Sequence, residues 1–145
     1  MREALQAPDA EVPDQLLQAA VRVLSGWDWQ RRPEVVVSVP SARHPQLVSS
    51  LAQGLAGIGR LRNAGELSWT SGGPSGSVEA NSAFRLAGLL DRFAVPEEMR
   101  AQIERACVLL VDDEVVSRWT LTITARELRR AAAEAVLPFA LGLRG

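Results

Sequence analysis

The chain has 145 residues, a formal net charge of −1 at pH 7, and 47% hydrophobic residues. This length fits one domain with a substantial core, and the near-neutral charge gives no electrostatic reason to expect nonspecific binding to DNA or membranes. All 16 basic residues are arginines. The lack of lysine excludes P-loop nucleotide binding, Schiff-base chemistry and receiver-domain phosphotransfer.

The chain contains one cysteine, Cys107, and one histidine, His44. These two residues cannot supply a zinc site of the usual kind, so we expect no metal bound directly by side chains. A lone cysteine forms no intrachain disulfide, which is typical of a cytoplasmic protein. No signal peptide and no apolar run long enough to span a bilayer are present, so we expect no membrane partner.

The first third of the chain predicts a helix, a strand and a second helix. Residues 1–12 are polar and contain proline, which predicts a loose lead-in or linker before a domain over residues 13–145. Apolar residues at helical spacing predict helices over residues 13–24 and 46–58. The apolar run at residues 34–39 predicts a buried strand between them, followed by a loop.

The rest of the chain continues the alternation of strands and helices. Residues 66–81 are rich in glycine, serine and proline and predict an exposed loop, while residues 83–95 are ambiguous between strand and helix. The remaining predicted elements are a helix at 96–105, a strand at 107–112, a helix at 120–133 and a strand at 135–143. This order predicts an α/β fold with a mainly parallel sheet of about five strands, helices on both faces, and a small flap at residues 69–84.

Two adjacent carboxylates, Asp112 and Asp113, close the apolar run at residues 107–111. An unbroken apolar run is typical of a strand buried on both faces of a parallel sheet. Ligands bind at the carboxyl ends of such strands, and an unpartnered buried carboxylate is costly. A hydroxyl-rich segment and a predicted helix follow, which suits a phosphate.

Three interpretations of the acid pair arise from these residues. A receiver domain needs a later phosphoacceptor aspartate and a lysine, and neither follows Asp113. A structural role would have Asp113 cap the next helix while Asp112 pairs with an arginine. A sugar-phosphate site would use the carboxylates as acceptors for a diol and the helix N-terminus for a phosphate. The last two interpretations stay open on the residues alone.

Residues 108–122, VLLVDDEVVSRWTLT, resemble the signature of type I phosphoribosyltransferases. The resemblance implies a 5-phosphoribosyl 1-diphosphate (PRPP) ligand, accompanied by Mg²⁺, with Asp112 and Asp113 against the ribose hydroxyls. Arg118 stands where the family usually has glycine and Trp119 where it has a small residue, which leaves phosphate binding open. The implied 5′-phosphate loop consists of Val116, Ser117, Arg118, Trp119 and Thr120.

Two further segments resemble parts of the same family. Residues 37–44, VSVPSARH, are similar to the strand and diphosphate loop of the competence-protein-F-like branch. This likeness implies that Ser41, Arg43 and His44 contact the diphosphate. Residues 69–81 are similar to the mobile catalytic flap, and the implied flap residues are Ser71, Gly72, Gly73 and Asn81.

The segments taken together resemble the C-terminal phosphoribosyltransferase-like domain of actinobacterial RecQ-type ATP-dependent DNA helicases, in which SRWTLT is the usual loop text. That likeness implies helicase domains and DNA as partners, a role in DNA repair, and a sugar-phosphate or nucleotide ligand. The chain has no Walker A sequence and therefore no ATPase motor. Two functions stay open, a phosphoribosyltransferase and a noncatalytic accessory module. The sequence determines neither the acceptor base nor whether the domain forms a homodimer.

Overall fold

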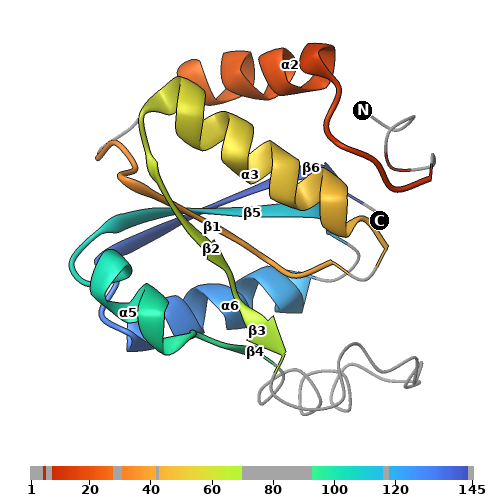
Figure 1. The fold of residues 1–145 in the computed structure, drawn as a ribbon. Helices are drawn as coiled ribbons and strands as arrows, with labels where there is room; N and C mark the ends of the chain where they lie inside the picture. The colour runs from red at the N-terminus through yellow and green to blue at the C-terminus, as the bar shows by residue number, and fades with distance from the viewer. Residues whose placement is uncertain are drawn as a thin grey trace.

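A parallel four-stranded sheet, in the order β2-β1-β5-β6, forms the centre of the molecule (Figure 1). The structure is a computed structural model that describes residues 5, 8–27, 31–41, 43–69, 93–115 and 118–143. A short antiparallel pair, β3 (Ser68–Trp69) with β4 (Phe93–Ala94), forms a second sheet. The strands of the main sheet are β1 (Val35–Ser38), β2 (Arg62–Glu66), β5 (Cys107–Val115) and β6 (Ala135–Leu143).

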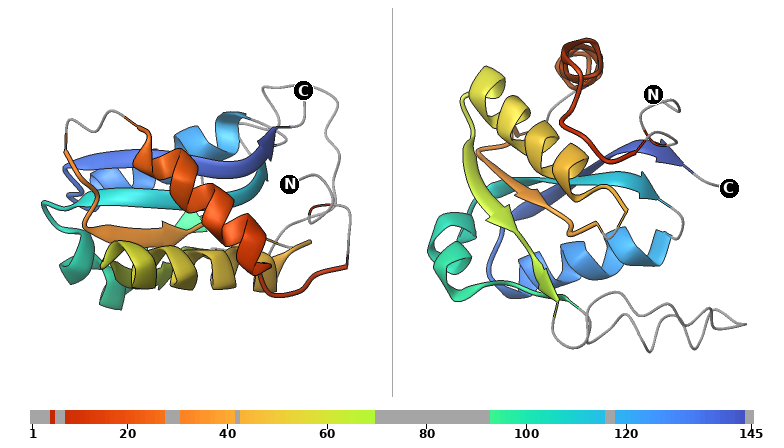
Figure 2. Two further views of the ribbon diagram at one scale, coloured as in Figure 1. Left: turned by 90° about the horizontal axis from the view of Figure 1, so that it is seen from above. Right: turned by 45° about the vertical axis from the view of Figure 1, so that its right-hand side comes forward.

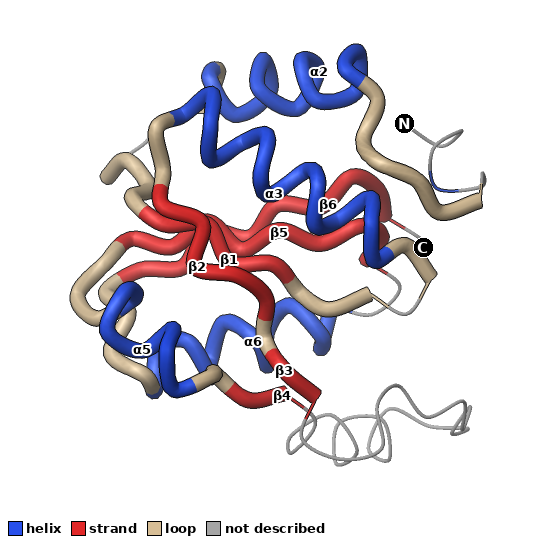
Figure 3. The backbone as a smooth tube through the Cα atoms, viewed as in Figure 1, coloured by secondary structure: helices blue, strands red, loops and turns tan. Residues whose placement is uncertain are grey.

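Helices cover both faces of the main sheet, as Figures 2 and 3 show. One face carries α2 (Asp14–Ser25) and α3 (Pro45–Gly59). The opposite face carries α5 (Glu97–Ile103) and α6 (Arg118–Arg130). The result is an open, mostly parallel α/β sheet, so the predicted fold class is confirmed.

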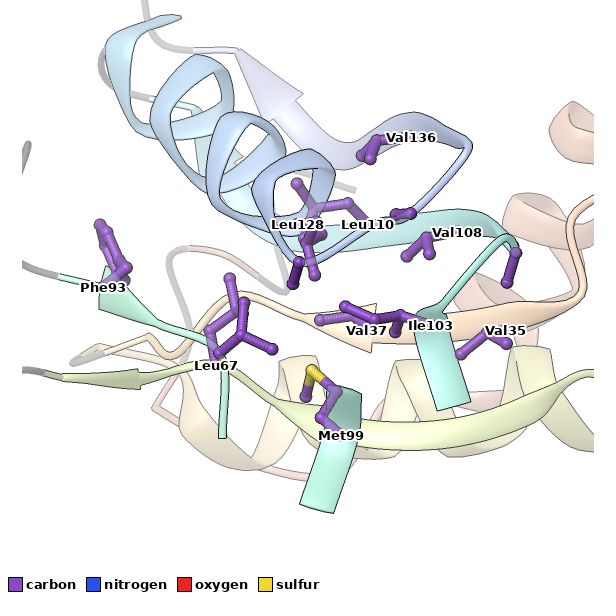
Figure 4. Close-up of a cluster of buried hydrophobic side chains, with 14 of the residues drawn as sticks. Val35, Val37, Leu67, Phe93, Met99, Ile103, Val108, Leu110, Leu128 and Val136 are labelled. Atoms are coloured by element: carbon purple, nitrogen blue, oxygen red, sulfur yellow. The ribbon is translucent and has the colours of Figure 1, made fainter. Parts of the chain in front are cut away.

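Successive side chains of the central strands enter two separate cores. Val35, Val37, Val108 and Leu110 point to the face of α5 and α6, where Figure 4 shows them with Ile103, Leu128 and their neighbours. Val36, Leu109 and Val111 pack in the cluster under α2 and α3. Because the sheet is covered on both faces, both sets must be apolar, which explains the unbroken hydrophobic runs in the sequence.

The helices lie within a few residues of their predicted positions, and the buried strands lie where the apolar runs predicted them. The prediction missed β2 and the short β3, which falls in the segment expected to be an exposed loop and follows the buried Leu67. The larger omission is β2. Its sequence, RNAGE, is polar and its residues are exposed or half-buried, since it is an edge strand held by its backbone hydrogen bonds to β1. The pairing shifts register between Val36 and Val37, and Gly65 has a φ of 101°, which favours glycine.

The predicted number of about five strands also needs correction, because the main sheet contains four strands in the described part of the chain. The ambiguous segment at residues 83–95 contributes β4, which pairs with β3 outside the main sheet. Trp27 packs on the sheet, with its ring centroid 5.9 Å from that of Phe139. Trp29 and most of the predicted flap lie outside the described residues.

None of the helices in the described part of the chain has the length and apolar character needed to span a membrane.

The chain reverses its direction of winding between β1 and β5. From β1 it passes through α3 to β2 at one edge, and from β5 it passes through α6 to β6 at the other. The two connecting helices therefore lie on opposite faces, as right-handed crossovers require. A crevice outside the carboxyl ends of β1 and β5 is the expected ligand position in such a sheet.

We predict that Leu110→Ala lowers the free energy of unfolding by about 2–5 kcal/mol, because it leaves a cavity beneath a fully buried strand. Ile58→Ala, at a side chain that is 54% exposed, is the control and should change stability by less than about 1 kcal/mol. Urea unfolding followed by circular dichroism measures both. Equal losses for the two variants would contradict the assignment of the core.

Candidate functional site

The carboxyl ends of β1 and β5 bring together four of the side chains singled out in the sequence. They are Ser41 and His44 from the loop between β1 and α3, and Asp112 and Asp113 from β5. The strand continues to Val115, so both carboxylates lie on the strand itself. The period of two directs Asp113 toward α3, after Leu109 and Val111, and directs Asp112 toward the α6 face.

Asp113 is held by two donors from the β1–α3 loop. The Ser41 hydroxyl donates to Asp113 Oδ2 at 2.9 Å, and His44 Nδ1 lies 2.9 Å from the same oxygen. The backbone N–H of His44 donates to Ser41 Oγ, also at 2.9 Å. His44 is 4% exposed and Asp113 is 8% exposed, so this network is buried. It fastens the loop that precedes α3 to the end of β5.

The environment of Asp112 favours its protonated form. Burial raises the pKa of Asp112 to about 8, and a hydrogen bond with Asp113 and the negative charge of Asp113 act in the same direction. Its Oδ1 atom accepts the backbone N–H of Asp113 at 2.8 Å. The two donors lie at Asp113, and hydrogen-bond donors stabilise the ionised form of a carboxyl group. A carboxylate only accepts hydrogen bonds, which assigns the proton of the His44 contact to Nδ1.

The N-terminus of α3 opens on the same edge of the sheet and already holds an anionic group. The two carboxylate oxygens of Asp9 accept the backbone N–H groups of Gln46 at 3.0 Å and Leu47 at 3.1 Å. The backbone N–H of Val12 donates to Ser50 Oγ at 2.7 Å, which fixes the same segment along α3. A carboxylate here satisfies free amide groups and the helix dipole. Residues 8–12, predicted as a loose lead-in, thus have specific contacts with α3.

The structure describes four more of the candidate residues, Arg43 and three residues of the implied phosphate loop. Arg43 is an exposed residue of the β1–α3 loop. Arg118, Trp119 and Thr120 form the first turn of α6 rather than a loop, because none of them is a glycine that would favour an irregular backbone. The other predicted site residues lie outside the described residues: Val116, Ser117, Ser71, Gly72, Gly73 and Asn81.

Asp9 is the residue of this edge that the sequence analysis missed. Aspartate is a common helix cap, but Asp9 lies 37 residues before the amide group of Gln46 that it binds. No local pattern connects residues so far apart, and only the folded chain shows the contact.

The arrangement suits recognition of hydroxyl groups beside an anion. A buried carboxylate accepts hydrogen bonds strongly, and helix N-termini favour negative groups. Within the described ranges, no group of three or more His, Cys, Asp or Glu side chains is placed to hold a metal ion.

No protein-family model and no curated protein sequence matches the chain. Its structure, however, resembles that of the allosteric regulatory enzyme of purine biosynthesis, with a TM-score of 0.58 and 21% identity over 86% of this chain. It also resembles glutamine phosphoribosylpyrophosphate amidotransferase from B. subtilis, with a TM-score of 0.53 and 21% identity over 86% of this chain. The chain spans about a quarter of each enzyme, 24% and 25% of their lengths respectively.

A third similar structure is a smaller protein, the purine phosphoribosyltransferase from Pyrococcus horikoshii Ot3. It gives a TM-score of 0.53 and 14% identity, and the match covers 93% of this chain and 78% of that one. These neighbours are type I phosphoribosyltransferases in fold, and the sheet described above is of that type. At such identities the likeness establishes the fold.

We predict that the stability of the protein falls between about pH 4 and pH 8 through Asp112. In that window the unfolded Asp112 is ionised while the folded one keeps its proton, because its pKa rises from 3.8 to about 8. Folding therefore takes up a proton, and stability declines with pH by at most about 1.4 kcal/mol per unit from this group. Asp112→Asn should flatten this part of the profile, as measured by urea unfolding at pH 5, 6.5 and 8. Parallel profiles for the two proteins would contradict the assigned proton.

We also predict that Asp9→Ala lowers the free energy of unfolding by about 0.5–2 kcal/mol, since it removes the acceptor of two α3 amide groups. Glu11→Ala removes an equal charge from an exposed residue two positions away and serves as the control. Thermal unfolding of both variants at low ionic strength provides the measurement. A loss as large in the Glu11 variant would assign the effect to net charge instead.

Proposed function

We propose that this chain binds a sugar phosphate of the PRPP type at the carboxyl ends of β1 and β5. The observation that carries this proposal is the winding reversal, which puts the Asp112–Asp113 pair beside the Ser41–His44 loop in a phosphoribosyltransferase-type fold. In the proposed complex the ribose hydroxyls bind at the acid pair. The 5′-phosphate lies toward the N-terminus of α6, which attracts anions, whereas Asp9 already accepts the first amide groups of α3.

Phosphoribosyl transfer needs little from the protein beyond placement and charge. A nucleophile attacks C1 of the ribose, the bond from C1 to the diphosphate oxygen breaks, and diphosphate leaves with the electron pair. Positioning and electrostatic stabilisation are sufficient for such a step, without a covalent protein intermediate. In this proposal the exposed guanidinium of Arg43 contacts the diphosphate, Ser117 and Thr120 belong to the 5′-phosphate site, and Mg²⁺ arrives with the ligand.

A second candidate function is a noncatalytic accessory module of a RecQ-type DNA helicase. Two observations favour it: the acid pair is buried, and Arg118 and Trp119 occupy the first turn of α6 where the family signature has small residues. The sequence likeness to actinobacterial helicase C-terminal domains, in residues 107–145 above all, adds support. In this case helicase domains or DNA are the partners, and the protein is located in the cytoplasm.

Thermal shift titration with PRPP and Mg²⁺ separates the two candidates. A ligand at a hundred times its Kd stabilises the folded state by about 2.7 kcal/mol, which corresponds to a rise in Tm of roughly 5–10 °C for a domain of this size. Asp113→Asn should abolish the rise because it removes the charge that accepts the ribose hydroxyls. Asp14→Asn, in the exposed first turn of α2, should keep it.

An unchanged Tm for the wild-type chain at millimolar PRPP would eliminate the ligand-binding function. Fluorescence anisotropy with labelled single-stranded DNA then tests the accessory function. Binding that weakens steeply with salt would support it.

A further inference from the structure

The Oδ2 atom of Asp113 receives two of the hydrogen bonds at this edge of the sheet. The Ser41 hydroxyl and His44 Nδ1 both lie 2.9 Å from it. Ser41 Oγ also accepts the backbone N–H of His44, so its own proton is directed at the carboxylate. The three residues thus form a closed ring of hydrogen bonds.

This ring determines how a ligand can reach the charge of the acid pair. Asp113 is 8% exposed and His44 is 4% exposed, so neither the carboxylate nor its imidazole donor is open to water. An oxygen of a carboxylate accepts about two hydrogen bonds, and both positions on Oδ2 are taken by the protein. A hydroxyl group from outside can bond to this oxygen only when one of the two donors leaves it.

We propose that the Ser41–His44–Asp113 ring is a self-ligated closed state. In this state the Ser41 hydroxyl and the His44 imidazole occupy the hydrogen-bonding positions on Asp113 that a ligand's hydroxyl groups would take. The inference rests on the proposed sugar-phosphate function and adds how that site opens. The ligand class is a sugar phosphate with neighbouring hydroxyls, such as ribose 5-phosphate. Binding exchanges the donors on Asp113 and releases the side chains of Ser41 and His44 from it.

The exchange is chemically balanced. One O–H or N–H donor leaves the carboxylate as another O–H donor arrives, so the buried charge is never without partners. Loss of a partner without replacement would be far more costly than an exchange. The closed state nevertheless weakens binding, because the ligand must compete with donors that are already in place.

Ser41→Ala tests this competition directly. Alanine cannot donate to Asp113, so one position on Oδ2 becomes available without displacement. Isothermal titration with ribose 5-phosphate should show binding about threefold to tenfold tighter than in the wild type. Ser68→Ala is the matched control, since Ser68 Oγ donates to the carbonyl of Ala94 in the separate β3–β4 pair. Its affinity should equal that of the wild type.

The imidazole gives a second measurement that needs no variant. His44 is the only histidine in the chain, so its Nδ1 signal in ¹⁵N NMR is unambiguous. The signal should report a protonated Nδ1 bonded to a carboxylate in the free protein, and it should change when ribose 5-phosphate binds. If Ser41→Ala fails to fold, the His44 signal of the wild type alone tests the exchange.

The possible outcomes are distinct. Tighter binding in Ser41→Ala, together with a His44 signal that changes as the wild type is saturated, supports the exchange. Weaker or equal binding in Ser41→Ala overturns it, as does wild-type binding that leaves the His44 signal unchanged, while the ligand-binding function survives. Absence of binding by both proteins, with ribose 5-phosphate and with PRPP and Mg²⁺, defeats the proposed function and the exchange together.

Discussion

A buried negative charge must be hydrogen-bonded, and in this protein that requirement falls on Asp113. The carboxylate lies on β5 after the buried apolar run of residues 107–111. Its partners come from a loop 69 residues earlier in the chain. The contact therefore joins the end of β5 to the start of α3 across the position where the winding of the sheet reverses. The hydrogen bonds to this one carboxylate therefore fix the positions of the β1–α3 loop and β5 at the carboxyl edge of the sheet.

The same burial bears on both candidate functions. For a ligand-binding protein, a saturated carboxylate means that the site has to open before it can be used. For an accessory module, it means that the two acids have become part of the framework that holds the loop in place. The neutral state of Asp112 fits both, because a shared proton removes the repulsion between adjacent carboxylates. Ligand response, rather than the presence of the acid pair, distinguishes the two.

The sequence was sufficient for the elements whose side chains are periodic or continuously apolar. β1, β5 and β6 follow from their hydrophobic runs, and α2, α3 and α6 from helical spacing. β2 was not predictable in this way, because an edge strand is specified by backbone pairing and carries no apolar signature.

At the site, the acid pair was recognisable from its place after an apolar run. Its partners on Asp113 were not assigned in advance, because tertiary pairing sets them. His44 was expected to face a diphosphate, and the structure shows its ring against Asp113. Asp9 had no local signal at all. These contacts link segments whose closeness depends on the order of strands in the sheet.

The two edge strands of the main sheet affect whether another strand can pair with it. β2 exposes polar residues and departs from regular register where it pairs with β1. At the other end of the described sheet, β6 contains Pro138, which lacks a backbone N–H donor. Irregular or donor-poor borders are poor templates for adding another strand. Both edges of the described main sheet therefore disfavour the addition of another strand.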